Sequence, residues 1–198
     1  LADAFEAGLD AWDVVMASGG GSVDVDSAAA LEGAQGLAVT VVDSNGQVHV
    51  RKHLAPYAST LSAEFLFDPN SLAMAEGSGH PIFLGDSIST SGLSITLQRW
   101  SGAYHLRLRV VQDDGQTVTT RLVPITDEPH TLHLEYSRAT APGVTDGHAQ
   151  LWIDGVAEPE LTGLSNSSVA LTSLRLGAVW QLDPGTAGTS YFDNFRAW

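Results

Sequence analysis

The stretch that decides the fold is Gly188–Trp198, which reads GTSYFDNFRAW. Its aromatic side chains favour a β-strand, because aromatic residues fit the pleated, half-buried surface of a sheet. Such a strand should be paired rather than free. The best candidate partner is the other end of the chain, Ala4–Trp12, which reads AFEAGLDAW. We therefore expect the two ends of the chain to lie side by side in one sheet.

Each end of the chain carries an acidic residue among aromatic ones. Glu6 follows Phe5, and Asp193 lies between Phe192 and Asn194. A carboxylate held beside packed aromatic rings must be hydrogen-bonded, paired with a cation or bound to a metal, because burying it alone is costly. If the ends meet, Glu6 and Asp193 can share one Ca²⁺. The alternative is that Glu6 accepts backbone N–H bonds and Asp193 makes a turn bond, with no metal.

The rest of the chain alternates apolar and polar residues with a period of two, which is typical of half-buried strands. The alternating segments are 37–42, 48–51, 61–67, 93–98, 105–110, 117–123, 132–136, 149–154 and 174–176. Turn residues separate them, and Ser44-Asn45-Gly46 is a hairpin signal. Helix signals are confined to short turns around Ser27–Gly33 and Asp68–Ala75. The pattern predicts an all-β chain folded as two antiparallel sheets packed face to face.

Composition narrows the class of protein. The 198 residues suit a single β-rich domain spanning 1–198, and the absence of cysteine excludes disulfides and thiol chemistry. A formal net charge of −14 with nine Lys and Arg argues against nucleic acid and anionic membrane surfaces as partners. No apolar run reaches about 18 residues, so no membrane insertion is expected. We expect an extracellular or cell-surface protein. A merely soluble or halophilic acidic surface is the alternative reason for the charge.

Several segments together resemble the concanavalin A-like lectin/glucanase superfamily, especially its laminin-G-like and carbohydrate-binding jelly rolls. They are FEAGLDAW (Phe5–Trp12), ALEGAQGLAVTV (Ala30–Val41), HTLHLEY (His130–Tyr136), DGHAQLWIDG (Asp146–Gly155) and the closing YFDNFRAW (Tyr191–Trp198). These segments cover most of the chain in the right order. The middle, Tyr57–Val123, matches only as alternating strands.

The resemblance implies a jelly roll in which a structural Ca²⁺ ties the first strand region, an early loop and the last strand. Carried over by position, the ligands would be the side chains of Glu6 and Asp193 with backbone carbonyls near Gly33 and Gln35. Hard cations take several oxygen ligands and accept backbone carbonyls readily, so this set is chemically reasonable.

Signals for catalysis are weak. No Glu-x-Asp-x-Glu run exists for a retaining glycosidase. Lyases with an alginate-lyase-like sandwich are expected to carry an Arg-rich strand, a Gln-x-His strand and a Tyr-containing strand near the C-terminus. Gln47-Val48-His49 and Tyr191 echo this, but the residues around them depart from those motifs. An enzyme is therefore the less favoured prediction.

A binding surface is easier to propose. Arg107 and Arg109 share a strand face with His105, and Arg99 and Trp100 lie just across the predicted hairpin. Arginine binds carboxylates or sulfates bidentately, and aromatic faces stack on sugar rings. The predicted ligand-binding residues are Arg107, Arg109, Trp100, Tyr104, His105 and Trp180. The alternative is that these arginines pair with neighbouring acids on a solvated sheet face.

The leading prediction is a non-catalytic carbohydrate-binding or adhesion module, stabilised by Ca²⁺, with a glycan or polysaccharide as its partner. The second is a structural building block of a surface layer or filament, whose edge strands or ends bind other copies or neighbouring domains. The third is a polysaccharide lyase or glycoside hydrolase.

Overall fold

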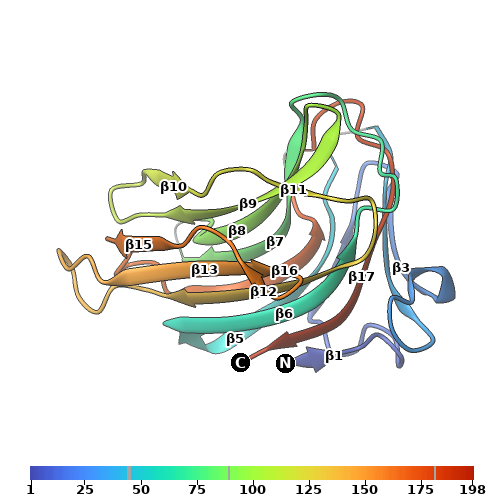
Figure 1. Ribbon diagram of the computed structural model, residues 1–198. Helices are drawn as coiled ribbons and strands as arrows, with labels where there is room; N and C mark the ends of the chain where they lie inside the picture. Colours follow the sequence, from blue (N-terminus) through green and yellow to red (C-terminus); the bar gives the residue numbers. More distant parts are fainter. Residues whose placement is uncertain (44–45, 89, 181) are drawn as a thin grey trace.

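Two antiparallel sheets lie face to face in the computed structural model, which describes residues 1–43, 46–88, 90–180 and 182–198 (Figure 1). Sheet A contains β1 (Ala2–Asp3), β3 (Ser22–Asp26), β4 (Gly36–Val41), β6 (Thr60–Asp68), β12 (His130–Ser137), β13 (Gly147–Ile153), β14 (Val156–Ala157), β15 (Leu161–Leu164) and β17 (Gly188–Ala197). Sheet B contains β2 (Val14–Ala17), β5 (Val48–Ala58), β7 (Gly79–Ser87), β8 (Leu93–Trp100), β9 (Ala103–Val111), β10 (Thr117–Thr119), β11 (Val123–Ile125) and β16 (Leu171–Ala178). The predicted β-sandwich is confirmed.

The main path through sheet A runs β14-β13-β12-β6-β17-β4-β3, and that through sheet B runs β10-β9-β8-β7-β16-β5-β2. Helical structure among the described residues is limited to one 3-10 turn, η1 (Ser27–Ala29). No described helix is long and apolar enough to cross a membrane. The second expected helical turn, within Asp68–Ala75, does not form. Instead, Asp68 Oδ1 accepts a hydrogen bond of 2.7 Å from the Asn70 N–H, which closes a turn.

The core lies between the sheets and is rich in phenylalanine. Phe65 and Phe67 of β6 and Phe192 and Phe195 of β17 are 0–1% exposed, as is Phe83 of β7 in the facing sheet. The Phe65 and Phe83 rings are 5.8 Å apart, and the Phe83 and Phe195 rings 6.2 Å apart. Each such side chain stabilises the fold by roughly 1.5–3 kcal/mol through burial. The period-two alternation of the strands therefore fixes which face of each strand enters the core.

The two ends of the chain lie side by side, as predicted, but the pairing segment differs. β1 pairs with β17, placing Ala2 opposite Arg196 and Asp3 opposite Phe195 (Figure 1). The expected partner Ala4–Trp12 is not a strand, because Asp3 folds it back by accepting the Phe5 N–H and the Trp12 indole N–H, both at 2.8 Å. Trp12 is then buried against the Phe5 and Phe195 rings.

The hairpin predicted around Ser44-Asn45-Gly46 is wrong. β4 pairs with β3 and β17 in sheet A, whereas β5 pairs with β2 and β16 in sheet B. Ser44 and Asn45 themselves lie outside the described residues. A connection between two packed sheets uses the same turn residues as a hairpin, so local turn chemistry does not reveal which strand the next one pairs with.

Candidate functional site

Arginine side chains line the outer face of sheet B. Arg51 on β5 lies opposite Arg175 on β16, which lies opposite Leu84 on β7. Leu84 lies opposite Ser94 on β8, and Ser94 opposite Arg109 on β9. Adjacent strands are about 4.8 Å apart, so this row crosses roughly 19 Å of sheet between Arg51 and Arg109. An extended ligand running across the strands would meet arginine at both ends of the row.

A neighbouring row adds further polar groups to the same face. Thr96 of β8 lies opposite Arg107 of β9, and Gln98 lies opposite His105. His49 precedes Arg51 by two residues on β5, so both point away from the core. The alternate residues of these strands, such as Val50, are fully buried between the sheets. The strands of sheet B therefore present polar side chains on their outer face and apolar side chains to the core on their inner face.

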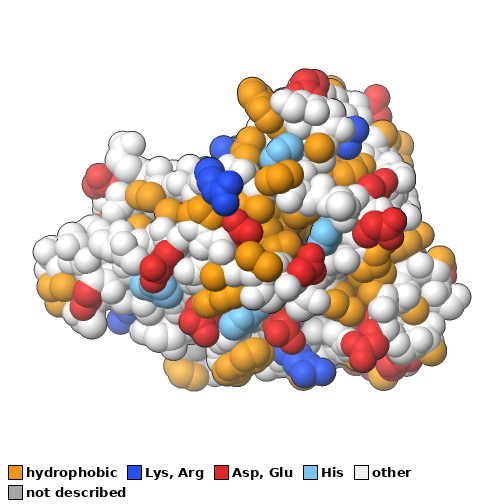
Figure 2. Space-filling view, viewed as in Figure 1, with side chains coloured by type: hydrophobic (Ala, Val, Ile, Leu, Met, Phe, Trp, Pro, Cys, Tyr) orange, Lys and Arg blue, Asp and Glu red, His pale blue; other side chains and the backbone are white. Residues whose placement is uncertain are grey.

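Positive charge is concentrated on this face. Of the nine Lys and Arg residues in a chain of net charge −14, four project here: Arg51, Arg107, Arg109 and Arg175. Arg175 donates from Nε to Asp86 at 2.7 Å, whereas the other three make no ion pair with a described carboxylate. Carboxylates are spread over the side of the molecule drawn in Figure 2, where Lys and Arg are sparse.

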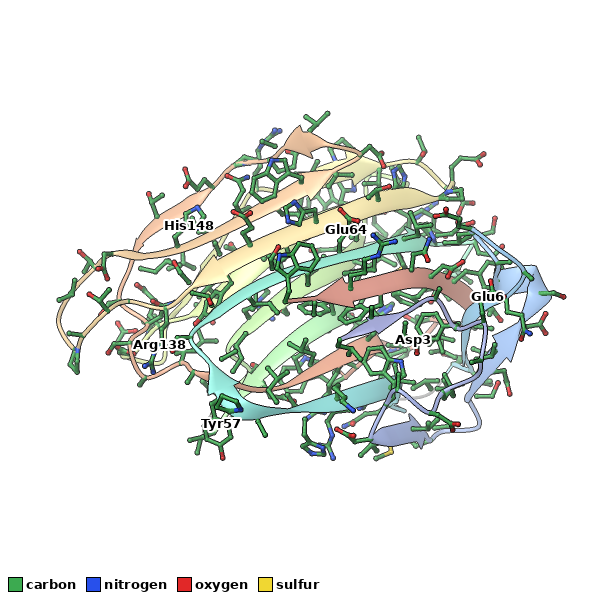
Figure 3. The ribbon with its side chains drawn as sticks, turned by 90° about the horizontal axis from the view of Figure 1, so that it is seen from below. Asp3, Glu6, Tyr57, Glu64, Arg138 and His148 are labelled. Carbon is green, nitrogen blue, oxygen red and sulfur yellow. The ribbon has the colours of Figure 1, made fainter. Side chains whose placement is uncertain are left out.

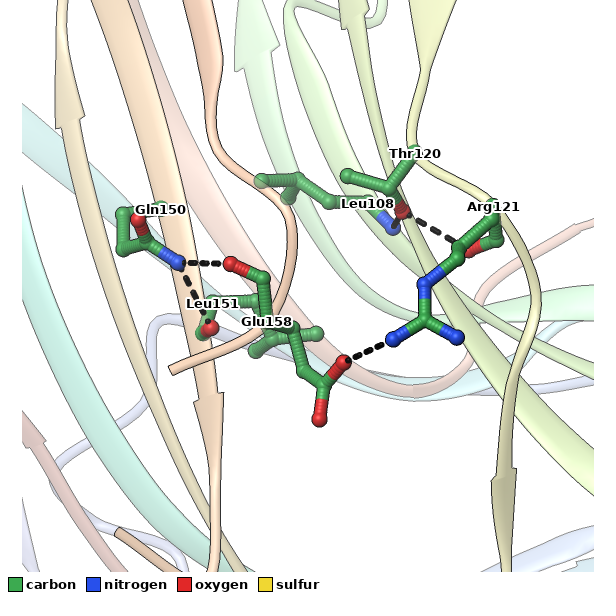
Figure 4. Close-up of polar contacts among 6 residues, drawn as sticks. All are labelled: Leu108, Thr120, Arg121, Gln150, Leu151 and Glu158. Atoms are coloured by element: carbon green, nitrogen blue, oxygen red, sulfur yellow. Dashed lines mark hydrogen bonds and ion pairs between the residues drawn. The ribbon is translucent and has the colours of Figure 1, made fainter. Parts of the chain in front are cut away.

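Other cations of the chain are already engaged. Arg121, between β10 and β11, lies 3.4 Å from Glu158, which follows β14 in the other sheet (Figure 4). Lys52 is paired with Asp13 at 2.9 Å. The predicted alternative, in which the arginines of β9 pair with neighbouring acids, does not hold for Arg107 or Arg109 among the described residues. Their charges remain available to a ligand.

Buried polar atoms without partners cluster on the same face. Among the described residues, eight buried side-chain nitrogen or oxygen atoms have no hydrogen-bond partner, and six belong to strands of sheet B, five of them at positions on its outer face. These five are His49 Nδ1, Arg51 Nε, Thr96 Oγ1, Gln98 Oε1 and Arg107 Nε. An unsatisfied buried polar group costs about 1–3 kcal/mol. A ligand that supplies both negative charge and hydroxyl groups would satisfy this set.

A pocket of about 360 Å³ lies at the β5 end of the face. Its polar lining residues are Arg51, His53, Tyr57, Asp86, Ser87, Thr172, Ser173 and Arg175. Tyr57 is 58% exposed and lies at the end of β5, where its side chain points away from the body of the molecule (Figure 3). The pocket thus combines two guanidinium groups with an imidazole and a phenol, the groups that acid–base chemistry on an anionic substrate requires.

His53 is held by a carboxylate. Its Nδ1 lies 3.3 Å from Oδ2 of Asp13, which also accepts the His53 backbone N–H at 2.7 Å. That backbone bond and then Lys52 lower the pKa of Asp13, so this carboxylate stays ionised at neutral pH. With a carboxylate beside Nδ1, the ring can carry its proton on Nδ1 and leave Nε2 to accept one from a substrate. This is the arrangement of an oriented general base.

A second pocket, of about 160 Å³, lies toward β9. Its polar lining residues are His80, Thr96, Gln98, Arg107, Arg109 and Asp183. Burial, and then the charge of Arg109, lower the pKa of Arg107. An anion bound between these two arginines would relieve both effects. Burial also lowers the pKa of His80 to about 4, so its imidazole is neutral at neutral pH.

The predicted ligand-binding residues divide into separate groups. Arg107, Arg109 and His105 share the outer face of sheet B. Tyr104 points into the core instead, with 5% exposure, and its hydroxyl donates to the Leu72 carbonyl at 2.5 Å. Trp100 is half-exposed at the end of β8. Ligand binding by any of them stays a prediction.

Trp180 follows β16, and its indole nitrogen is buried without a partner among the described residues. The structure adds site residues that the sequence did not single out, namely Arg51, His53, Tyr57, Asp86 and Arg175. Their outward direction was readable from the alternation of β5 and β16. What the sequence did not reveal is that these strands lie in the same sheet as β9.

Gln47-Val48-His49, the segment that resembles the Gln-x-His strand of alginate lyases, does not form a site together with Tyr191. Gln47-Val48-His49 leads into β5 of sheet B, whereas Tyr191 lies on β17 of sheet A, opposite Ala38. His49 is 2% exposed, and burial, followed by the charges of Arg175 and Arg51, lowers its pKa to about 4. It is a neutral group beneath the arginines.

The predicted metal ligands do converge on one loop. Glu6 Oε1 accepts the backbone N–H groups of Ala34 and Gln35 at 2.7 and 3.3 Å. Asp193, fully buried, accepts those of Leu31 and Glu32 at 3.0 and 2.9 Å. Gly33, with φ of 77°, lets the loop approach Glu6 closely.

These contacts fit Ca²⁺ only in part. Burial, and to a lesser extent the charge of Glu6, raise the pKa of Asp193, and a cation between the two carboxylates would relieve that repulsion. However, the loop turns N–H groups rather than carbonyls toward both acids. No cluster of three His, Cys, Asp or Glu suited to a metal occurs among the described residues. The hydrogen bonds match the metal-free alternative, and Ca²⁺ stays a prediction.

No protein-family model matches the chain, and no curated protein matches it. Solved structures do. An endo-β-1,4-glucuronan lyase from the fungus Trichoderma reesei superposes with a TM-score of 0.70 and 16% identity, covering 96% of this chain and 91% of that one. A cellulose-induced protein, Cip1, gives 0.72 and 16%, covering 100% and 96%. The alginate lyase vAL-1 from a Chlorella virus gives 0.63 and 16%, covering 94% and 92%.

These likenesses agree with the two-sheet antiparallel β-sandwich described above, and at 16% identity they show the fold alone. They also overturn the leading functional prediction. A non-catalytic binding or adhesion module is the wrong first choice, because the similar structures are repeatedly polysaccharide lyases and because ionisable residues converge in a pocket of this chain. The enzyme that the sequence placed third is the better supported alternative.

Proposed function

We propose that this protein is a polysaccharide lyase that cleaves an anionic, uronate-containing polysaccharide on the outer face of sheet B. The observation that carries the proposal is the set of unpartnered buried polar atoms among arginines on one face of an otherwise acidic protein. Such a face attracts a polyanion locally and offers hydrogen bonds to its hydroxyl groups. The structural likeness to glucuronan and alginate lyases supports the same substrate class.

The pocket at the β5 end contains groups for a β-elimination. In a uronate residue, the C5 proton is next to the carboxylate, and the glycosidic oxygen on C4 is the leaving group. Arg51 and Arg175 would bind the carboxylate and stabilise the charge that develops as the C5–H bond breaks. His53 Nε2 would take that proton, and the Tyr57 hydroxyl would protonate the departing oxygen. The C4–O bond breaks and a C4=C5 double bond forms, with no water consumed.

The pocket toward β9 would hold another uronate of the same chain. Arg107 and Arg109 supply the charge, and Gln98 supplies an amide for hydroxyl groups. The two pockets lie on one face, so a polysaccharide running across the strands would occupy both. Because Arg107 and Arg109 would contact substrate away from the broken bond, they contribute to binding rather than to the chemical step.

The test is an assay of polyglucuronate and alginate by the ultraviolet absorbance of the new double bond conjugated to the carboxylate. We expect activity on at least one of them and none on neutral β-1,4-glucan. Arg51→Ala should lower kcat/KM by about tenfold to a hundredfold, because it removes a charge-assisted hydrogen bond. Tyr57→Phe should lower kcat with little change in KM, because it removes a proton donor and not the ring.

Arg121→Ala is the matched control, because Arg121 is an exposed arginine away from this face and should leave kcat/KM unchanged (Figure 4). Absence of the double bond with every polyuronate would exclude the proposed activity. Equal kinetic effects of Arg51→Ala and Arg121→Ala would exclude the proposed site.

Two sequence-based expectations accompany this proposal. We propose an extracellular or cell-surface location, because such polysaccharides are found outside cells. We also propose a structural Ca²⁺ at Glu6 and Asp193, with a role in stability and none in the chemistry. It is supported by the binding of both carboxylates to the same loop and by the effect of the Glu6 charge on the pKa of Asp193.

A further inference from the structure

The outer face of sheet A, on the opposite side of the sandwich from Arg51, Arg107, Arg109 and Arg175, carries a stack of three aromatic rings. His133 on β12 lies opposite Trp152 on β13, with ring centroids 4.7 Å apart and planes inclined by 21°. The Trp198 ring lies on the other side of His133, 6.3 Å away and inclined by 15°. The three rings are therefore nearly parallel and form a short ladder across the strands.

Trp198 is held in place although its side chain is exposed. Its backbone N–H and carbonyl both bond to Ser62 of β6 at 2.9 Å, and Ser62 Oγ lies 3.1 Å from His133 Nε2. The Trp198 side chain is nevertheless 69% exposed. A large aromatic ring that is fixed by its backbone and open to solvent presents apolar area to a ligand at little entropic cost.

A shallow cavity of about 440 Å³ adjoins the Trp198 ring. Its polar lining consists of Thr60, Ser62, Glu135, Ser137, His148 and Trp198. Hydroxyl, carboxylate and imidazole groups beside an aromatic wall match the hydroxyl-bearing edges and apolar faces of a pyranose ring. Figure 3 looks onto this face, with Glu64 on β6 and His148 on β13.

Charge separates this surface from the arginine face. Glu135 is the acidic residue in the cavity, and Glu160 lies 2.6 Å from His148. Glu64 lies opposite His133 on one side and opposite Arg196 of β17 on the other, so the charges of Glu64 and Arg196 offset each other. No arginine or lysine lines the cavity. Acidic groups accept hydrogen bonds from sugar hydroxyls, but they repel carboxylates. The ligand that fits is an uncharged sugar chain.

We propose that the Trp198 face, defined by Trp152, His133, Trp198 and the adjoining cavity, is a second carbohydrate site that binds neutral glycan chains. It is separate from the proposed cleavage site, because it lies on the opposite sheet and would take a different class of sugar. Its role would be to hold the enzyme on an uncharged polysaccharide while the arginine face acts on a uronate-containing one.

The test measures binding of the full chain to cellohexaose, xylohexaose and mannohexaose by calorimetry, with a hexauronate as the anionic probe. We expect binding of at least one neutral hexasaccharide, accompanied by a shift in tryptophan fluorescence. Trp198→Ala should weaken that binding at least tenfold and leave kcat/KM on a soluble polyuronate unchanged. Trp198→Phe should keep most of the affinity, because it retains an aromatic face.

Trp100→Ala is the comparison on the other sheet, since Trp100 is a half-exposed tryptophan of β8 whose predicted ligand is that of the arginine face. It should therefore leave the binding of neutral sugars unchanged, whatever its effect on the hexauronate. The proposal is overturned if no neutral hexasaccharide binds, or if Trp198→Ala and Trp100→Ala bind equally. It is also overturned if Trp198 proves necessary for binding the hexauronate or for self-association instead. Loss of lyase activity in Arg51→Ala with neutral binding intact would show the two sites to be independent.

Discussion

At the scale of single residues, the charged and the neutral groups of the arginine face have different physical origins. Arg51 and Arg107 are partly exposed arginines whose Nε atoms are buried without a partner among the described residues, whereas the side chains of His49 and His80 are buried, with 2% and 1% exposure. Burial lowers the pKa of both histidines from 6.5 to about 4. A neutral imidazole at His49 adds no positive charge beside Arg51 and Arg175, so the face keeps its arginines without increasing their mutual repulsion.

These two histidines predict a pH dependence of stability. Between about pH 6.5 and about pH 4 the unfolded chain binds protons at both positions and the folded chain does not, so the free energy of unfolding falls as the pH falls. From about pH 7.5 to about pH 5 each histidine should contribute about 2 kcal/mol to this loss. Urea unfolding at the two pH values measures it. His80→Gln should show a smaller loss than the wild type, and an equal loss would contradict the assignment.

At the scale of elements, β5 and β16 supply most residues of the pocket that contains Arg51 and Arg175. The pairing of these two strands requires their backbones to approach closely at one position. Gly177 on β16 lies opposite His49 on β5, with φ of 122°. A Cβ placed there would be 2.6 Å from the Val48 carbonyl oxygen and 3.0 Å from the His49 Cα. Both neighbours are backbone atoms of a paired strand and cannot rotate away. The absence of a side chain at Gly177 therefore sets the distance between the two arginine-bearing strands.

Gly177→Ala should destabilise the fold more than a matched glycine substitution elsewhere. Gly115 also has a positive φ, of 80°, but a Cβ there meets nothing within 4 Å. Both changes incur the backbone cost of about 1–2 kcal/mol for a side chain at positive φ. Gly177→Ala adds overpacking worth about 1–3 kcal/mol. Chemical denaturation of the two variants gives the difference, and equal losses would show that the strands can separate without cost.

At the scale of the whole molecule, the sandwich keeps two chemically distinct faces apart. Sheet B presents arginines outward, and sheet A presents carboxylates with aromatic rings. The shared core lies between them, and β1 and β17 join the two ends of the chain at one side of sheet A (Figure 1). A Ca²⁺ at Glu6 and Asp193 would stabilise this junction and, through it, the entire fold.

Calcium should therefore raise the unfolding temperature without changing the kinetics of cleavage. At a hundredfold excess over Kd, ligand binding adds about 2.7 kcal/mol, which for a chain of this size corresponds to roughly 5–10 °C. Calorimetry with Ca²⁺ and with EDTA measures the difference. Glu6→Gln should abolish the response, and Asp10→Asn, which changes an exposed acid nearby, should keep it. Identical unfolding temperatures with Ca²⁺ and EDTA would favour the hydrogen-bonded, metal-free alternative.

The sequence by itself determined most of the long strands, their buried faces and the meeting of the two chain ends, but it missed β7 and assigned the meeting to Ala4–Trp12 instead of β1. Alternation of Leu106 and Leu108 with Arg107 and Arg109 fixes side-chain directions locally, because successive residues of a strand point to opposite faces. The same alternation correctly placed Arg107, Arg109 and His105 together on one face of a strand. The tertiary structure alone decided that β5 and β16 join β9 in one sheet, which brings Arg51 and Arg175 to that face. Strand partners are chosen by packing between segments distant in sequence, and the period of two carries no information about that choice.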